Sequence, residues 1–327
     1  MSALDAYTPS SPGAAAAVAA LLGGTLAAGF FLSRLEGWLG RAATWSLVLG
    51  SVIAAHFLTI SEPAGVRMLA LIGAGLWALK AVVLHEERRR GLPAASLGQW
   101  LAFASWPGMK ARLFVQPSER ELEGGGELLR RGALRLALGA ACLAGAWASW
   151  RAWELRVPST ALLLVGLSLV LHFGVCNLLA GFWRTRGVAC RTLFQAPLLA
   201  ESLNEFWSRR WNLAFSEMTA TAVYRPLSVP WGRGPALVAA FLFSGLLHEL
   251  AISVPVQAGF GLPLVYFALH GGLCWLERAL EARERGIRGW GGRLWTVFWL
   301  VAPLPILFHP PFLEGVAWPL IGMAGGA

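Results

Sequence analysis

The chain has 327 residues, of which 56% are hydrophobic and only 14% are charged. Soluble domains carry about 25% charged residues, so this composition excludes an ordinary soluble protein and indicates an integral membrane protein. A net charge of +9 would suggest nucleic acid in a soluble chain. Here the Arg residues stand in short loops between apolar blocks, so the charge indicates membrane topology and no nucleic-acid partner.

Apolar blocks of about 18–22 residues, long enough to cross a hydrocarbon core of about 30 Å, predict eight transmembrane helices. In chain order the predicted spans are residues 14–33, 42–60, 67–84, 134–150, 158–181, 236–254, 262–279 and 294–312. No internal repeat or separable second domain is visible. We therefore expect an all-α, polytopic fold with one membrane domain over residues 1–327 and additional interfacial amphipathic helices.

The Lys and Arg residues gather in alternate connections between these spans. The connections rich in Lys and Arg are residues 34–41, 85–133 (with a charged, Gly-rich loop at 119–131), 182–235 and 280–293. The opposite side carries only Arg67, Arg151 and Arg156, while Lys80 stands near the rich end of the third span and can extend toward it. The positive-inside rule makes the rich connections cytoplasmic and predicts that both termini lie outside.

An amphipathic helix at the cytoplasmic interface is predicted over residues 203–218. Ser202 at the N-cap and Glu205 three residues later form a capping-box pattern, and Glu205 with Arg209 forms an i,i+4 pair. The apolar face would contain Leu203, Phe206, Trp207, Trp211, Ala214 and Met218. The polar face would contain Asn204, Glu205, Ser208, Arg209, Asn212 and Ser216.

The polar residues available for chemistry are few. Asp5 is the one Asp in the chain, which excludes a Ser-His-Asp triad, a DxD metal site and an HxxxxD motif. The four Cys form no CxxC pair, so we expect no disulfide framework, no metal site and no cofactor. Chemistry must therefore use His, Glu, Asn, Ser or Arg.

Two of the six His lie deep in predicted spans. His248 and His270 enter from opposite sides, at roughly 18 Å and 12 Å along helices with a rise of 1.5 Å per residue, so they reach a similar depth. Ser244 shares a face with His248, whereas Glu249 points about 100° away and would bond elsewhere or orient a neighbour. The pair could simply join two helices, or a desolvated, neutral His could act as a general base. For His56, His85 and His309 we expect no direct chemical role, while His172 in the fifth span could line a cavity or simply bond a neighbouring carbonyl.

Four segments in order resemble the plant-type wax synthases of the membrane-bound O-acyltransferase superfamily. Residues 202–212 resemble that family's S-L-x-x-F-W-x-R-R-W-N signature, and residues 106–109 its W-P-G-M stretch. Residues 243–250 resemble its S-G-x-x-H-E/D block, and residues 267–277 its F-x-x-H-G-x-x-x-x-x-E block. The resemblance covers about residues 100–280, which would form the acyltransferase core.

This resemblance implies an enzyme that moves a fatty acyl group from acyl-CoA to the hydroxyl of a long-chain alcohol. His248 matches the catalytic His, and Asn212 matches the polar residue paired with it in related enzymes. Asn212 on an interfacial helix would have to dip inward to meet His248. We expect the substrates to contact Asn204, Trp207, Arg209, Arg210, Trp211, Ser244, Glu249 and His270. Arg209 and Arg210 would attract the phosphates of acyl-CoA, the co-substrate.

Other functions remain open at this point. The same mechanism could acylate a sterol or another hydroxylated lipid or metabolite. A proton-coupled lipid or small-molecule transporter could use the His pair as a relay, although no repeat symmetry supports it. A non-catalytic membrane scaffold is a third class. The Ala-, Gly-, Leu- and Arg-rich composition suggests a bacterial inner membrane as the location, among membrane lipids, with the endoplasmic reticulum as an alternative.

Overall fold

The computed structural model describes residues 5–117 and 122–323, and in these ranges all regular secondary structure is helical. Residues 118–121, which include part of the predicted charged loop at 119–131, lie outside the described residues. Contacts divide the chain into two compact units. The first comprises residues 5–193 with 313–323, and the second comprises residues 194–312. The predicted core at about 100–280 is therefore shared between the units.

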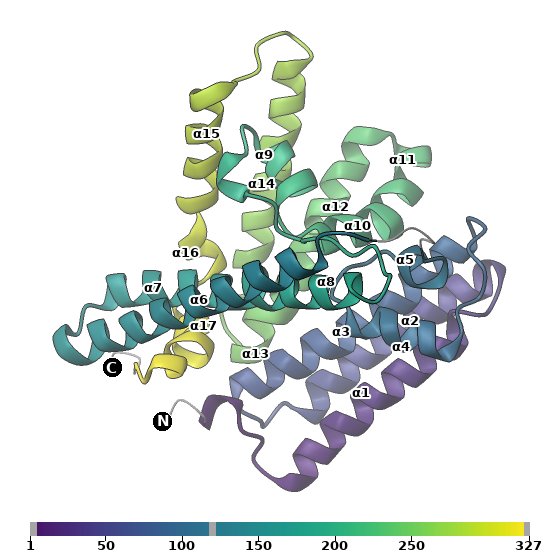
Figure 1. Cartoon of the computed structure of the whole chain (residues 1–327), viewed down its shortest axis with the longest axis horizontal. Helices are drawn as coiled ribbons and strands as arrows, with labels where there is room; N and C mark the ends of the chain where they lie inside the picture. The colour runs from purple at the N-terminus through teal and green to yellow at the C-terminus, as the bar shows by residue number, and fades with distance from the viewer. Residues whose placement is uncertain (1–4, 118–121, 324–327) are drawn as a thin grey trace. The chain divides into compact units, whose positions relative to one another are not determined.

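The first unit consists of an N-terminal group of helices and a long antiparallel pair (Figure 1). Its elements are η1 (Asp5–Tyr7), α1 (Pro12–Leu32), α2 (Gly37–Leu58), α3 (Ala64–Arg88), α4 (Leu97–Ser105), α5 (Arg112–Val115), α6 (Gly125–Trp153), α7 (Arg156–Ser168), the π-helical η2 (Leu169–Val175), α8 (Cys176–Arg184), η7 (Leu313–Ala317) and η8 (Trp318–Ile321). Helices α1, α2 and α3 pack on one another, and α6 packs along α7, η2 and α8.

A buried lysine holds the W-P-G-M stretch in this unit. Lys80 is fully buried in α3, and its Nζ donates to the Gly108 carbonyl at 3.0 Å and lies 3.9 Å from the centre of the Phe103 ring. Gly108 belongs to the 85–133 connection that was predicted to be cytoplasmic, so this bond is directed to the segment toward which Lys80 was expected to extend. A carbonyl and an aromatic face replace the water that the ammonium loses on burial.

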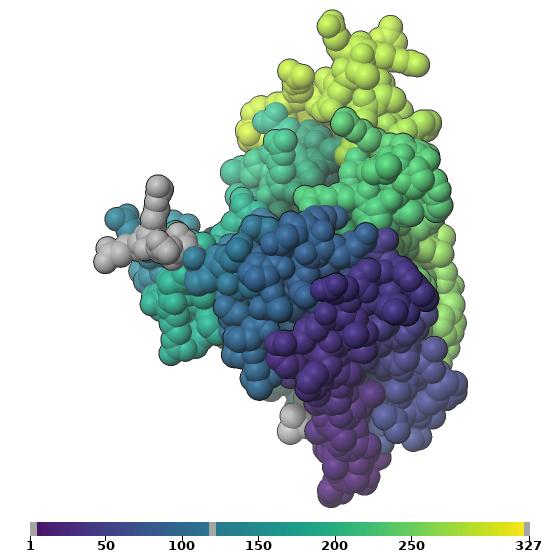
Figure 2. Space-filling view, turned by 90° about the vertical axis from the view of Figure 1, so that its right-hand side faces the viewer, coloured from purple at the N-terminus to yellow at the C-terminus, as the bar shows by residue number. Residues whose placement is uncertain are grey.

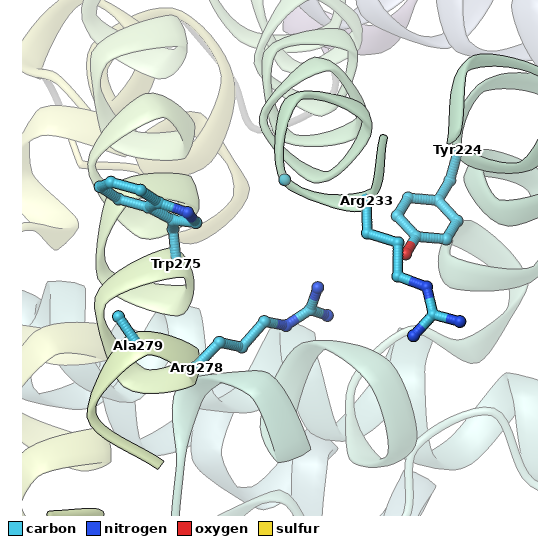
Figure 3. A pocket seen from close by; sticks show the side chains of 6 residues that line it. Tyr224, Arg233, Trp275, Arg278 and Ala279 are labelled. Atoms are coloured by element: carbon cyan, nitrogen blue, oxygen red, sulfur yellow. The ribbon is translucent and has the colours of Figure 1, made fainter. Parts of the chain in front are cut away.

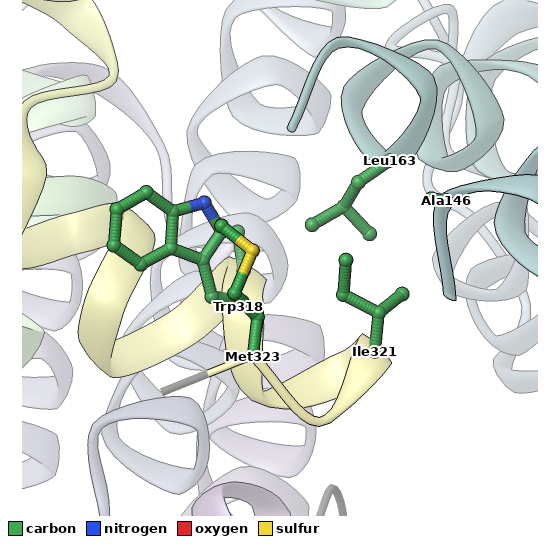
Figure 4. Packing of buried hydrophobic residues seen from close by; sticks show 6 residues of the cluster. Ala146, Leu163, Trp318, Ile321 and Met323 are labelled. Atoms are coloured by element: carbon green, nitrogen blue, oxygen red, sulfur yellow. The ribbon is translucent and has the colours of Figure 1, made fainter. Parts of the chain in front are cut away.

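The C-terminal segment packs on the antiparallel pair. Trp318, Ile321 and Met323 form a buried cluster with Ala146 of α6 and Leu163 of α7 (Figure 4). The indole of Trp318 also donates to the Thr160 Oγ1 at 2.9 Å. The C-terminal segment is thus held to α6 and α7 by apolar packing and one hydrogen bond.

The second unit carries all the predicted site residues except the W-P-G-M stretch. Its elements are η3 (Pro197–Leu199), α9 (Leu203–Glu205), the π-helical η4 (Phe206–Arg210), α10 (Leu213–Thr219), the π-helical η5 (Ala220–Tyr224), α11 (Arg225–Trp231), α12 (Arg233–His248), the π-helical η6 (Glu249–Ser253), α13 (Val254–Val256), α14 (Leu262–Glu281), α15 (Gly289–Val301), α16 (Leu304–Leu307) and α17 (Pro310–Phe312). Helix α12 packs against α14, which places the two deep His on neighbouring helices. Gly245 allows this approach, because a Cβ there would lie 2.8 Å from the Leu264 side chain and 2.9 Å from its Cα.

The first six predicted spans are confirmed as helices long and apolar enough to cross a membrane. Their exposure differs: 11% of the most apolar window of α1 is buried, against 61% in α3. The exposed N-terminal residues appear in dark purple in Figure 2. The seventh predicted span, α14, has 20 residues but does not reach the same apolarity, because it carries His270, Glu277 and Arg278. The eighth is broken into α15, α16 and α17 and counts as a seventh span only if the bent stretch is taken as one. The described residues thus form an all-α, multi-pass membrane protein with six or seven such spans.

Candidate active site

The signature segment is not the single amphipathic helix that its periodicity predicts. It runs as α9 and the π-turn η4 to Arg210, breaks at Trp211 and Asn212, and resumes as α10. Asn212 lies in the left-handed region at φ 44°, a conformation that Asn tolerates better than most residues. Its Oδ1 accepts from the Phe215 amide at 3.2 Å and so caps α10. Helix α10 therefore starts in a new direction.

Glu277 of α14 fastens the start of this segment. Its Oε1 accepts from the Leu203 amide at 2.8 Å and from the Trp295 indole at 3.0 Å. Its Oε2 accepts from the Asn204 amide at 2.9 Å and from the Asn204 Nδ2 at 2.8 Å. The buried carboxylate thereby satisfies the free amides at the N-terminus of α9. The side chain of Asn204 also donates to the Cys274 carbonyl at 2.8 Å and accepts from the Arg278 Nε at 2.9 Å.

Changing Glu277 to Gln is expected to destabilise the protein by at least about 2 kcal/mol, because an NH2 group would face two buried donors. Thermal unfolding of purified protein in detergent measures this effect. Glu281→Gln is the matched control, since Glu281 is exposed on the same helix and its replacement should change stability by less than about 0.5 kcal/mol. Equal unfolding temperatures for the two variants would contradict the anchoring role.

The two signature arginines differ in their surroundings. Arg210 pairs with Glu205 at 2.7 Å and donates to the carbonyls of Gln195 and Ala196, so the predicted Glu205–Arg209 pair was wrong. Burial disfavours the ionised Glu205, but hydrogen bonds from the Glu201 amide and from Arg210 outweigh it and lower the pKa of Glu205. Arg210 thus holds the preceding loop, while Arg209 is exposed.

Only half of the predicted capping box forms at the start of α9. Ser202 Oγ accepts from the Glu205 amide at 3.0 Å, as the pattern predicts. The Glu205 carboxylate reaches the amide of Glu201 at 2.8 Å rather than the amide of Ser202. Glu205 therefore links the helix start to the preceding loop instead of closing the box on the cap residue itself.

His248 is the last residue of α12, where the α-helix passes into the π-helical η6. Its Nδ1 lies 2.7 Å from the Ser244 carbonyl. A carbonyl only accepts, so Nδ1 carries the proton and Nε2 keeps its lone pair. Among the described residues Nε2 has no hydrogen-bond partner. A neutral ring with this tautomer can accept a proton from a hydroxyl at Nε2.

His270 is fully buried in α14 and has the opposite tautomer. The Trp207 indole N–H donates to His270 Nδ1 at 3.2 Å, so the proton of the neutral ring resides on Nε2. That buried Nε2 has no hydrogen-bond partner within the described ranges. One His can thus accept a proton from a substrate, and the other can donate a hydrogen bond to one.

An aromatic cluster connects the two rings. Phe267, one turn before His270, has its ring centre 4.1 Å from that of His248 and 5.6 Å from that of Trp207. The Trp207 ring is 5.4 Å from that of His270. Phe215 of α10 lies 5.7 Å from His248, so the helix capped by Asn212 does reach the sixth span. The structure thereby brings His248, His270, Trp207 and the neighbourhood of Asn212 together.

The remaining predicted site residues have mainly structural contacts. Ser244 Oγ donates back to the Ala240 carbonyl, while its own carbonyl orients His248. Glu249 accepts from the Leu264 amide at 3.0 Å, so it bonds away from His248, as its helical angle predicts. Trp211 stacks on Phe206, with ring centres 5.5 Å apart. These contacts position the residues that face the reaction.

Three residues of the site were not predicted as such. Glu277 and Arg278 hold Asn204, and Phe267 supports His248. A signal for two of them was present, because Phe267 and Glu277 are the first and last letters of the fourth motif. Their spacing of ten residues places them on one helix but does not reveal their partners.

Known proteins are similar to this chain over the part that includes the signature segment. Residues 190–269 match the family described as "Membrane bound O-acyl transferase family", a range that includes Asn212 and His248. The chain is 33% identical over 141 residues to probable long-chain-alcohol O-fatty-acyltransferase 6 of Arabidopsis thaliana, covering 37% of this chain and 41% of that protein. It is 31% identical over 111 residues to the long-chain-alcohol O-fatty-acyltransferase of Simmondsia chinensis, covering 31% of this chain and 32% of that protein.

A third relative, probable long-chain-alcohol O-fatty-acyltransferase 2 of Arabidopsis thaliana, is 34% identical over 141 residues, which cover 39% of this chain and 40% of that protein. The matched part thus spans about two fifths or less of the length of these relatives. The family match at residues 190–269 includes His248 and the signature segment. Over residues 190–269, this chain is similar to the membrane bound O-acyl transferase family.

Proposed function

We propose that this protein transfers a fatty acyl group from acyl-CoA to the hydroxyl of a long-chain alcohol, giving a wax ester. The observation that carries the proposal is the Nδ1–H of His248 donating to the Ser244 carbonyl, which leaves Nε2 as a free base in the family segment. The names of the relatives support the long-chain alcohol as acceptor. No cofactor is part of the proposal, and acyl-CoA is a co-substrate.

In the proposed reaction, His248 Nε2 takes the proton from the alcohol hydroxyl as its oxygen attacks the thioester carbonyl. A new C–O bond forms and the carbonyl oxygen becomes an oxyanion. When the tetrahedral intermediate collapses, the C–S bond breaks and the imidazolium returns its proton to the leaving thiolate. The products are the ester and free CoA, so atoms and charge balance.

We propose two groups as stabilisers of the oxyanion. Asn212 uses Oδ1 for the cap of α10, and its Nδ2 has no acceptor among the described residues. His270 Nε2–H is the second candidate. Donors of this kind typically contribute about 10²–10³-fold each to the rate. In this proposal Asn212 and His270 polarise the thioester while His248 activates the alcohol.

Trp207→Phe tests the tautomer of His270. The variant keeps an aromatic ring against Phe267 but removes the N–H that fixes the proton on Nε2. One hydrogen bond of this kind is worth about 1 kcal/mol, so kcat/KM should fall about fivefold. Trp290→Phe, at an indole that is 77% exposed, is the control and should leave kcat/KM unchanged. An unchanged kcat/KM in Trp207→Phe would contradict the role of Trp207 in fixing the proton of His270 on Nε2.

A panel of acceptors tests the proposed function. Purified wild-type protein receives labelled palmitoyl-CoA with hexadecanol, a sterol, or a short-chain alcohol, and the products are separated and identified by mass spectrometry. The proposal predicts that hexadecanol gives the most ester. Sterol ester as the main product would show that the acceptor is a sterol and not a long-chain alcohol, with the same mechanism. Proton-coupled flux in liposomes without any ester would show that the protein is a transporter and not an acyltransferase.

The protein is an integral, multi-pass membrane protein. Its composition is the support for placing it in a bacterial inner membrane, whereas the relatives named above are plant proteins. In a bacterial inner membrane or in the endoplasmic reticulum alike, the alcohol would arrive from the lipid phase and acyl-CoA from the aqueous side.

A further inference from the structure

A pocket of about 570 Å³ opens in the second unit beside α14. It is lined by Tyr224, Arg233, Gly234, Trp275, Arg278 and Ala279. Figure 3 shows the Arg278 side chain pointing toward Arg233. The Trp275 indole and the Tyr224 ring lie on opposite sides of the two arginines. These residues come from η5, the start of α12 and the end of α14, so no sequence motif groups them.

The pocket carries positive charge without an acidic partner in its lining. Arg278 uses Nε to donate to Asn204 Oδ1, which fixes its direction and leaves both terminal nitrogens available. Arg233 makes no hydrogen bond or ion pair within residues 5–117 and 122–323. The adjacent Glu277 is buried and turned to α9, where it accepts four hydrogen bonds. Two guanidinium groups facing one cavity are suited to a phosphate.

The aromatic wall narrows the class of ligand. The indole of Trp275 is 59% exposed, so its face is open to a ligand in the pocket. A planar base could stack on it and cover this area, as aromatic side chains do with nucleotides. A simple inorganic phosphate would use the arginines but leave the indole exposed. Phosphate and a planar ring together describe a nucleotide.

We propose that this pocket binds the phosphorylated nucleotide end of the acyl-CoA donor, with the phosphates on Arg233 and Arg278 and the adenine on Trp275. The proposal rests on the proposed function. Arg278 lies eight residues after His270 on the same helix, about 12 Å at 1.5 Å per residue. The extended arm between the nucleotide and the thioester spans such a distance. Arg233 and Arg278 thus replace Arg209 and Arg210 as the phosphate-binding pair.

Binding of adenosine 3′,5′-bisphosphate, which has no acyl group, tests the pocket without turnover. Purified protein in nanodiscs of neutral phosphatidylcholine is titrated by calorimetry, and quenching of Trp fluorescence is followed in parallel. Arg233→Gln and Arg278→Gln should each raise Kd about tenfold, because each removes a charge-assisted contact. Ala279→Leu, which fills the pocket without changing charge, should also raise Kd. Arg288→Gln, at an exposed arginine between α14 and α15, is the control.

Kinetics give a second measurement. In both arginine variants the KM for palmitoyl-CoA should rise about tenfold. In Arg233→Gln kcat at saturation should stay within about twofold, and kcat is compared in this variant alone because Arg278 also holds Asn204. A Kd and KM equal to wild type in both variants and in Ala279→Leu would overturn the proposal. So would a loss of binding confined to Arg209→Gln. Wild-type ester formation with unchanged variants would retain the proposed function and reject the pocket alone.

A lipid headgroup offers the same phosphate chemistry, and nanodisc composition separates the two sources. Replacing phosphatidylcholine by anionic phosphatidylglycerol should weaken nucleotide binding by less than about threefold if the pocket is a nucleotide site. Abolition of nucleotide binding by the anionic lipid, with that effect lost in Arg233→Gln and Arg278→Gln, would assign the pocket to a lipid headgroup and overturn the proposal. Binding of the bisphosphate without any ester from wild type would instead reject the acyltransferase.

Discussion

Replacing His248 by Gln is expected to lower ester formation by about 10²–10⁴-fold, the contribution of a positioned general base. Gln can still donate to the Ser244 carbonyl, as Nδ1–H does, and it fills much of the space beside Phe267. It has no basic nitrogen, so it cannot accept the hydroxyl proton. Initial rates with palmitoyl-CoA and hexadecanol, together with thermal unfolding of the same samples, separate lost chemistry from lost folding.

His172→Gln is the matched control for that variant. His172 also lies within a long apolar helical stretch at a π-helical turn, where its Nδ1 is 3.2 Å from Ser168 Oγ, but it belongs to the first unit and to no motif. Its replacement should leave the rate within about threefold of wild type. If His248→Gln, folded and pure, retained more than a tenth of wild-type activity, His248 would not be the base.

Replacing Asn212 by Asp or by Gly is expected to lower the rate by about 10²–10³-fold with little loss of stability. Asp retains an oxygen for the Phe215 amide but has no N–H to donate. Gly tolerates the φ of 44° and costs a cap only a few tenths of a kcal/mol. The two variants therefore remove the free Nδ2 in different ways while the break before α10 is kept.

Gln257→Gly provides the control for the Asn212 pair. Gln257 is also a non-glycine residue with positive φ, at 54°, and it ends α13 away from the signature segment. Its replacement should alter neither the rate nor the product. Activities of Asn212→Asp and Asn212→Gly within threefold of wild type would leave Asn212 with a structural role alone, as the cap of α10.

The membrane spans could be predicted because hydrophobicity and length are local properties of the sequence. The first six appear where the apolar blocks predict them. The seventh helix, α14, forms at the predicted place, but the polar side chains that make it less apolar are the ones that serve the site. The eighth predicted span is broken because Pro303, Pro310 and Pro311 interrupt the helix. Hydropathy alone does not show where such a break occurs.

The signature segment shows where periodicity fails. A helical pattern over residues 203–218 assigns every residue the same backbone, whereas η4 is a π-turn and Asn212 has positive φ. Both depend on tertiary partners, chiefly Glu277 and the Trp207–His270 bond. The i,i+4 rule likewise selected Arg209 for Glu205, but the π-turn moves Arg210 into that place.

The pairing of the deep His was predictable in part. Depth and the short connection between their helices predict that His248 and His270 are neighbours, and the structure places both around Phe267 and Trp207. Their opposite tautomers were not predictable, because each depends on a single hydrogen bond to Ser244 or Trp207. The roles proposed for the two rings therefore come from the structure rather than from the motif.

The most direct test of acyl transfer measures thiol release from palmitoyl-CoA by purified wild-type protein with and without hexadecanol, while the ester is quantified in the same samples. The account predicts that thiol release requires the alcohol and equals the amount of ester formed. Thiol release that is independent of the alcohol would show hydrolysis instead of transfer. The absence of both products across alcohols and sterols would contradict the acyltransferase assignment.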